Sequence, residues 1–194
     1  MKKVIINLAI IFLFCCIQIQ SATIVGGSSL LTQSYANQIE TWLGEGAITL
    51  TNIYTKQSGH TSTNFHNAVD GQGRTFSIIE VIGHNNIIGG YNPSSWDTTT
   101  GYRTANNADA FVFNLSISQV RYHSYKVQIY ESCNHPSYGP TFGNGHDIYV
   151  SSSLTSGYTY SYAYRSSTSD GLADDYSTGY AYGLITNGSG LSIG

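Results

Sequence analysis

The chain has 194 residues, with 8 Lys or Arg against 11 Asp or Glu and a formal net charge of −3. Charged residues make up only 10% of the sequence, whereas about a quarter is typical of globular proteins. Binding to phosphates requires clustered cations, and the chain has no Lys/Arg cluster, so nucleic acid is excluded as an expected partner.

The first residues are typical of a secretory signal peptide. Lys2 and Lys3 precede an apolar run over residues 4–17, and small residues follow at Ser21 and Ala22. We therefore predict cleavage of segment 1–22 and a location outside the cell or in the lumen of the secretory pathway. The run is short for a membrane span, so no membrane association is expected after cleavage. An uncleaved anchor is the alternative.

Cleavage would change the cysteine content of the protein. Cys15 and Cys16 lie in the apolar run, so only Cys133 would remain. No intramolecular disulfide and no zinc site of paired cysteines is then expected. We predict a buried or half-buried thiol at Cys133, with a bridge to another chain as the alternative.

Apolar residues at helical spacing predict a helix over residues 28–43. Ser28 or Ser29 could cap its start, and Gly44 stands at the position of a left-handed C-terminal cap. The residues of the apolar stripe are Leu31, Tyr35, Ile39, Trp42 and Leu43.

Short strands dominate the chain after this helix. One short helix is predicted over residues 63–69, with Thr63 as its cap and Gly71 and Gly73 at its end. Many short strands with few helices predict a mainly β protein, a two-sheet antiparallel β-sandwich with a few short flanking helices over residues 28–183. The Gly/Ser/Asn-rich residues 184–194 are expected to form a flexible tail. The predicted strands cover residues 47–54, 75–82, 87–90, 111–115, 125–130, 147–150 and 158–164.

Alternate residues of the last predicted strand are tyrosines. Period-two spacing places Tyr158, Tyr160, Tyr162 and Tyr164 on one face of a strand. Such a row can bind a flat or sugar-like ligand, or it can pack on the opposing sheet with its hydroxyls at the rim.

The segment YGPTFGNGHDIYV, residues 138–150, predicts a shaped loop that leads into a strand. Gly139 and Pro140 precede Gly143 and Gly145, whose backbone we expect at positive φ. We expect Asp147 to accept backbone N–H bonds of this loop. On a strand, the adjacent His146 would point to the opposite face, beside solvent.

No set of residues forms a recognised catalytic or metal-binding motif, so we assign no catalytic residues, metal or cofactor. His66 and Asp70, four apart, could hold a cation; a helix-surface hydrogen bond, or no interaction at all, is the alternative. Cys133 near His135 is no dyad without a fold that pairs them. An exported hydrolase acting on surface glycans through Glu80 or Asp147 is the alternative function, as is a carbohydrate-binding module. Two glycosylation sequons begin at Asn114 and Asn187.

Several fragments in a fixed order resemble the TLDc domain family. These are ITLTNIY, then IIGGY with a following Trp, DAFVFNL, and GPTFG with GHDI. The resemblance implies a sandwich of two antiparallel sheets, association with an unknown protein partner in place of catalysis, and a link to oxidation resistance. It also implies the proton-pumping ATPase as a partner, although this chain departs from such relatives in its signal peptide. The structural motif residues it marks are Gly89, Gly90, Trp96, Gly139, Pro140, Gly143, Gly145, His146 and Asp147.

Overall fold

The computed structural model describes residues 21–83, 86–104, 110–116, 120–124, 130–160, 163–165 and 191–194, and for 120–124 and 165 only the backbone. The predicted signal peptide with Cys15 and Cys16, most of the predicted strand 125–130, and the sequon at Asn187 lie outside these residues. Within the described part, the protein is mainly β with antiparallel sheets and two short helices, which confirms the predicted fold class. No helix in this part is long and apolar enough to cross a membrane.

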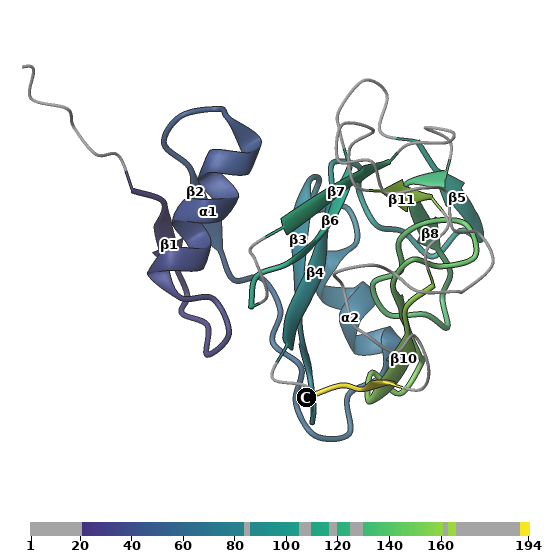
Figure 1. Cartoon of the computed structure of the whole chain (residues 1–194). Helices are drawn as coiled ribbons and strands as arrows, with labels where there is room; N and C mark the ends of the chain where they lie inside the picture. Colours follow the sequence, from purple (N-terminus) through teal and green to yellow (C-terminus); the bar gives the residue numbers. More distant parts are fainter. Residues whose placement is uncertain are drawn as a thin grey trace, which may run out of the picture.

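A five-stranded antiparallel sheet forms the centre of the domain (Figure 1). Its longest strands are β3 (Thr75–Val81) and β4 (Asn86–Asn92), which correspond to the predicted strands 75–82 and 87–90 and pair antiparallel, with Ile79 opposite Ile88. β4 then pairs with β6 (Phe111–Asn114), and β6 with β7 (Val120–Ser124). The sheet ends at β11 (Tyr164–Arg165) on one side and at β3 on the other.

Both faces of this sheet are buried, because the side chains of β3, β4 and β6 alternate between two apolar layers. The inner core contains Ile79, Ile88 and Val112 of the sheet together with Trp96 and Phe142. The outer cluster lies on the opposite face and contains Tyr91, Phe111, Phe113 and Leu115, with Phe76 and Ile78 packed against them.

Gly89 and Gly90 in β4 allow an aromatic ring to approach the sheet from each side. A Cβ atom at Gly89 would lie 2.7 Å from the ring of Phe113, in the outer cluster. A Cβ atom at Gly90 would lie 2.6 Å from the ring of Phe142, in the inner core. This pair of the structural motif therefore has a packing role.

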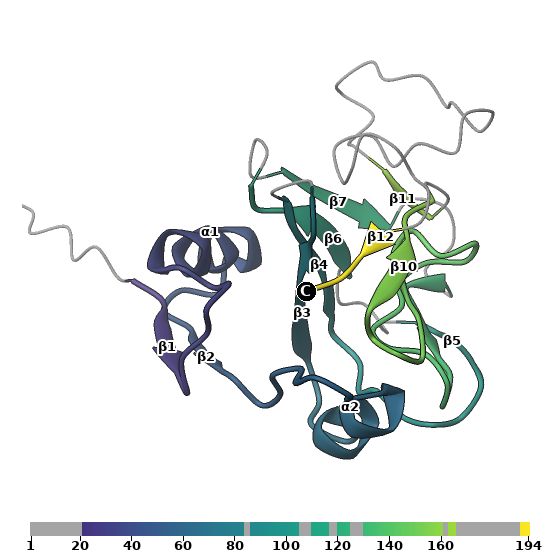
Figure 2. The ribbon, with the colours of Figure 1, turned by 90° about the horizontal axis from the view of Figure 1, so that it is seen from below.

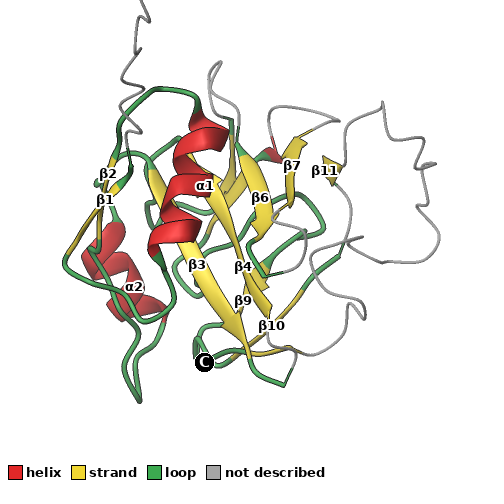
Figure 3. Ribbon diagram, turned by 60° about the vertical axis from the view of Figure 1, so that its left-hand side comes forward, coloured by secondary structure: helices red, strands yellow, loops and turns green. Residues whose placement is uncertain are grey.

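Helix α1 (Gln33–Leu43) covers the outer cluster with Tyr35, Trp42 and Leu43 (Figure 3). It begins later than predicted, because the oxygen of Thr32, and not that of Ser28 or Ser29, accepts the bond from the amide of Tyr35. Its end is as predicted: Gly44 has φ 66° and its amide donates to the carbonyl of Glu40.

Helix α2 (Ser62–Val69) closes one side of the inner core with Phe65 and Val69. The predicted cap at Thr63 is wrong, since a capping box joins Thr61 to Asn64. Gly71 and Gly73, predicted to end the helix, adopt positive φ immediately after it.

Shorter strands complete the domain, and a small sheet covers the inner core (Figure 2). That sheet has the order β12-β10-β9, with β9 (Tyr149–Val150), β10 (Ser156–Tyr158) and β12 (Leu191–Ser192). β1 (Thr23–Val25) pairs in parallel with β2 (Thr49–Thr51), and β5 (Gly101–Arg103) pairs with β8 (Ser132–Asn134).

Three sequence-based expectations are corrected by these strands. The predicted strands 47–54 and 147–150 shorten to β2 and β9. Residues 158–164 do not form one strand, since β10 ends at Tyr158 and β11 begins at Tyr164 in another sheet. The predicted tail is not frayed at residues 191–194, because Leu191 and Ile193 are buried and β12 pairs with β10.

Candidate functional site

The glycine loop, residues 142–148, is closed at its base by paired backbone bonds between Phe142 and Ile148. Gly143 and Gly145 have φ values of 80° and 91°, which confirms the predicted positive φ. The next residue, His146, also has a positive φ of 64°, an uncommon conformation for a residue with a side chain. The loop is therefore a tight turn that ends just before β9.

Asp147 ties this loop to the start of β11. Its carboxylate is buried and accepts the amide of Ala163 at 3.0 and 3.1 Å and the amide of Tyr164 at 3.0 Å. A Cβ atom at Gly143 would lie 1.8 Å from Oδ2 of Asp147, so the carboxylate fills the space that the glycine leaves open. Asp147 was expected to accept N–H groups of the glycine loop; this is corrected, because the amides that it accepts here belong to residues 163 and 164, outside the loop.

His146 differs from its prediction. It lies in the turn, not on a strand face, and it is half-buried. Burial lowers the pKa of its imidazole, and its Nδ1 atom is hydrogen-bonded to the hydroxyl of Tyr158 at 2.7 Å. The ring also stacks on Tyr149, with centroids 5.5 Å apart.

His146 belongs to a group of half-buried rings that we call the ring cluster: His135, Tyr138, His146, Tyr149 and Tyr158. Neighbouring rings lie 4.2 to 6.0 Å apart, the closest being His135 stacked on Tyr138. Burial and the nearby phenols of Tyr149 and Tyr138 raise the pKa of Tyr158. The cluster therefore presents aromatic rings with hydroxyl and imidazole groups, which can bind a partner by stacking and by hydrogen bonds.

The predicted tyrosine row is not one surface. Tyr158 joins the ring cluster, Tyr160 is 40% exposed, and Tyr162 lies outside the described residues. Tyr164 is buried and donates its hydroxyl to the carbonyl of Glu131. Burial, together with the carboxylates of Asp147 and Glu131, raises the pKa of Tyr164 well above its ordinary value.

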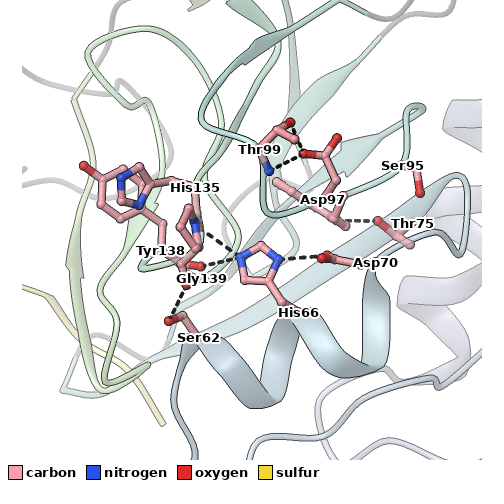
Figure 4. A network of polar contacts seen from close by, with 12 residues as sticks. Ser62, His66, Asp70, Thr75, Ser95, Asp97, Thr99, His135, Tyr138 and Gly139 are labelled. Carbon is pink, nitrogen blue, oxygen red and sulfur yellow. Dashed lines mark hydrogen bonds and ion pairs between the residues drawn. The ribbon is translucent and has the colours of Figure 1, made fainter.

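His66 fixes the segment that carries two rings of the cluster (Figure 4). It is buried in α2, where Nε2 donates to the carbonyls of His135 at 3.0 Å and Tyr138 at 3.1 Å. Nδ1 lies 2.8 Å from Oδ1 of Asp70. Ser62 adds a bond from its hydroxyl to the carbonyl of Pro136. The pair is thus a buried bracket between α2 and residues 135–138, not a bond on the helix surface.

The remaining motif residues lie in the core around the loop. Trp96 is 1% exposed and donates from Nε1 to the hydroxyl of Thr75 at 2.8 Å. Gly139 allows close packing of Val150 and Leu154, next to the half-buried Pro140. Asn114 is fully buried in β6, so its sequon is not accessible in the folded domain.

Cys133 is buried in β8, and burial raises the pKa of its thiol. The expectation of a buried thiol is confirmed. The ring of His135, which is near Cys133 in the sequence, stacks on Tyr138. Glu80 is exposed on β3. Across the part of the chain that the structure describes, no three His, Cys, Asp or Glu side chains are placed to hold a metal ion.

The sequence did not predict the ring cluster as a unit. Tyr138, His146 and Tyr149 all belong to the singled-out segment 138–150, which was the available signal. The positive φ of His146, which turns its ring toward Tyr149 and Tyr158, has no recognisable signature in a histidine followed by aspartate.

A comparison with family models identifies the family of the chain. The model described as "TLDc domain" matches residues 24–178, which include the described helices, the glycine loop and the ring cluster. No curated protein matches the chain.

Proposed function

Because this chain belongs to the TLDc domain family, we propose that it is an exported, non-catalytic interaction module that binds a protein partner through the ring cluster. Relatives are linked to oxidation resistance, which makes a stress-related role part of the proposal. The single observation that carries it is the group of five half-buried rings beside the glycine loop. Tyrosine is enriched at protein interfaces because it offers large contact area with a polar tip.

The surroundings of the ring cluster favour a neutral contact. Residues 132–160 contain no Lys, Arg or Glu, and their one carboxylate, Asp147, is buried and bonded to amides. Because the carboxylate of Asp147 already accepts two backbone amides, a structural role is favoured over a role as the acid or base of a hydrolase. The proton-pumping ATPase is a partner only by family analogy, and a fold shared with relatives does not transfer their partners.

A carbohydrate-binding module is the second candidate function. The same observation favours it, because aromatic rings with hydroxyl and imidazole tips can stack on a sugar and bind its hydroxyls. Serine and threonine are frequent in the segments that carry the cluster, at Ser137, Ser151, Ser153 and Thr155.

The two candidates can be separated with the purified protein and one pair of variants. The test compares wild type with Tyr149→Ala for capture of proteins from the native extracellular fraction and for binding to a neutral glycan array. Loss of a hot-spot aromatic should weaken the true interaction at least about tenfold. Ile82→Ser is the matched control, since Ile82 is 55% exposed in the turn after β3.

Each outcome has a definite meaning once circular dichroism shows that both variants are folded. Protein capture that fails only for Tyr149→Ala supports the proposal, and glycan binding that fails in the same way supports the second candidate. Turnover of a glycan or ester that one carboxylate substitution abolishes would show an enzyme and reject both.

Export is tested separately, because it rests on Lys2, Lys3 and the apolar run over residues 4–17. Mass spectrometry of the native protein should find an N-terminus near Thr23. An intact Met1 on a cytosolic pool would reject export without affecting the proposed binding surface.

A further inference from the structure

We propose that the open edge of β3 is a docking site for an extended peptide of a protein partner. The peptide would form a strand in the groove between β3 and β2, antiparallel to β3. This inference does not depend on the ring cluster, whose rings do not line the groove.

The groove is a cavity of about 700 Å³ beside the five-stranded sheet. One wall includes Thr49 and Thr51 of β2, and the other includes Phe76 and Ile78 of β3. β2 lies between β1 and β3 (Figure 2), so the groove separates the β1–β2 pair from the last strand of the sheet.

The backbone of β3 directs unused hydrogen-bonding groups into this groove. At the far end of the strand, Ile82 donates to the carbonyl of Ser192 at 2.9 Å and the carbonyl of Glu80 accepts the amide of Gly194 at 3.2 Å. The even-numbered residues therefore direct their backbone groups away from β4. Since these directions alternate along a strand, Phe76 and Ile78 direct N–H and C=O groups into the groove. Among the described residues, no backbone bond from this side of either residue is found.

The backbone of β2 faces the same space. Its bonds to β1 are made by even-numbered residues, with the carbonyl of Ile48 accepting from Thr23 and the amide of Asn52 donating to Val25, each at 2.9 Å. The backbone groups of Thr49 and Thr51 therefore point to the other side of β2. Both walls thus present strand edges, which are templates for pairing with another strand.

An existing interface of this domain indicates what kind of molecule fits. Residues 192–194 already pair with this edge of β3, and Ile193 lies opposite Val81 in antiparallel register. A peptide that continues this row past Gly194 would reach Ile78 and then Phe76. Because both walls offer backbone donors and acceptors, an extended peptide can satisfy them, whereas an acyl chain cannot.

The side chains of the groove define the chemistry of the peptide. Phe65 and Val69 line it on the inner-core side, and Leu43, Phe76 and Ile78 line it on the side of the outer cluster. A strand buried on both faces is a continuous apolar run in sequence. The partner segment is therefore a short, uncharged run rich in Val and Ile.

The probe for this site is the peptide acetyl-KTVIVTK-amide, titrated into the full chain by calorimetry. Its matched control is the same peptide with both valine nitrogens methylated, which keeps the side chains but removes two backbone donors. The unmodified peptide should bind at least about tenfold more tightly than the control. Amide hydrogen exchange should slow at Phe76 and Ile78 but not at Ser77 and Ile79, which already face β4.

A variant of the protein tests the opposite wall. Thr51→Pro removes one groove-facing donor from β2 and should weaken binding several-fold, whereas Thr51→Val keeps the donor and should bind as wild type does. If Thr51→Pro does not fold, the comparison of the unmodified and methylated peptides with the wild-type protein still tests the proposal. Absence of binding, or equal binding of the methylated peptide, would overturn the proposal. Sedimentation that shows a dimer with the same amide protection and no peptide would also overturn it, since a second copy would then fill the groove.

Discussion

Two residues of the glycine loop depend on each other for their conformation. Gly143 leaves the space that the Asp147 carboxylate occupies, and the carboxylate in turn receives the amides of residues 163 and 164. A side chain at position 143 therefore disturbs more than its own backbone. It also displaces the acceptor that joins the loop to β11.

The first prediction compares two glycines that both have positive φ. Gly143→Ala should lower the free energy of unfolding by about 3 kcal/mol, from backbone strain plus the displaced carboxylate. Gly71→Ala is the matched control, because Gly71 has φ 74° with open space where the Cβ would lie. It should cost only about 1 kcal/mol. Urea unfolding followed by circular dichroism measures both, and equal losses would contradict the role of the carboxylate.

The second prediction concerns the pH dependence that His146 gives to stability. Burial lowers the pKa of His146 in the folded state, below the ordinary value of 6.5. As the pH falls below 6.5, the unfolded state binds the proton more readily than the folded state, so this contribution to stability is lost toward acidic pH. In the variant His146→Asn, the asparagine tolerates positive φ and carries no titrating group. When the pH is lowered from 8 to 5, the free energy of unfolding of this variant should fall less than that of the wild type. Identical pH profiles from urea unfolding would contradict this.

At the level of the elements, α2 acts as the support of the ring cluster. The side chains of His66 and Ser62 hold the segment 135–138 by donating hydrogen bonds to three of its carbonyls. His135 and Tyr138, which project from that segment, are stacked on each other. The surface geometry thus depends on hydrogen bonds that lie beneath it.

The third prediction tests this support. His66→Leu should lower the free energy of unfolding by about 1–3 kcal/mol, because the carbonyls of His135 and Tyr138 lose the imidazole donor, and only the His135 carbonyl keeps another, the amide of Tyr138. Asp70→Asn is the control, because it leaves the Nε2 bonds in place and an amide side chain can donate to Nδ1 or accept from it; its cost should be about 1 kcal/mol or less. Thermal and urea unfolding of the two variants give the comparison. A His66→Leu variant as stable as Asp70→Asn would show that the bracket contributes little.

Elements whose signal is local were predictable from the sequence, and those built by distant pairing were not. The β-branched and aromatic residues of β3 and the apolar stripe of α1 are local signals, so both elements were predicted, although α1 begins later than expected. β8 and β12 have two or three residues and are strands only because they pair with distant segments. The bracket at His66 was missed for the same reason, since its carbonyl partners lie 69 and 72 residues away.

For the whole molecule, the central sheet separates two apolar layers that are held by different helices. α2 completes the inner core with Phe65, whereas α1 covers the outer cluster with Trp42. The ring of Trp42 lies 5.7 Å from Phe113 and 6.1 Å from Phe111. Damage to one layer should therefore affect its own helix first.

The fourth prediction follows from this arrangement. Trp42→Ala should destabilise the protein by about 2–4 kcal/mol, because it removes a large side chain from the outer cluster. Hydrogen exchange should increase more at the amides of α1 than at those of α2. An equal increase in both helices would show that the two layers open as one unit.

The positions of the two tryptophans have an optical consequence. The chain has only Trp42 and Trp96, one in each apolar layer, and Trp96 is 1% exposed whereas Trp42 is half-buried. Their fluorescence should therefore differ in colour, with Trp96 emitting at shorter wavelength than Trp42. Replacing Trp42 by Phe would leave a single emitter inside the inner core, and its emission would report on that layer alone.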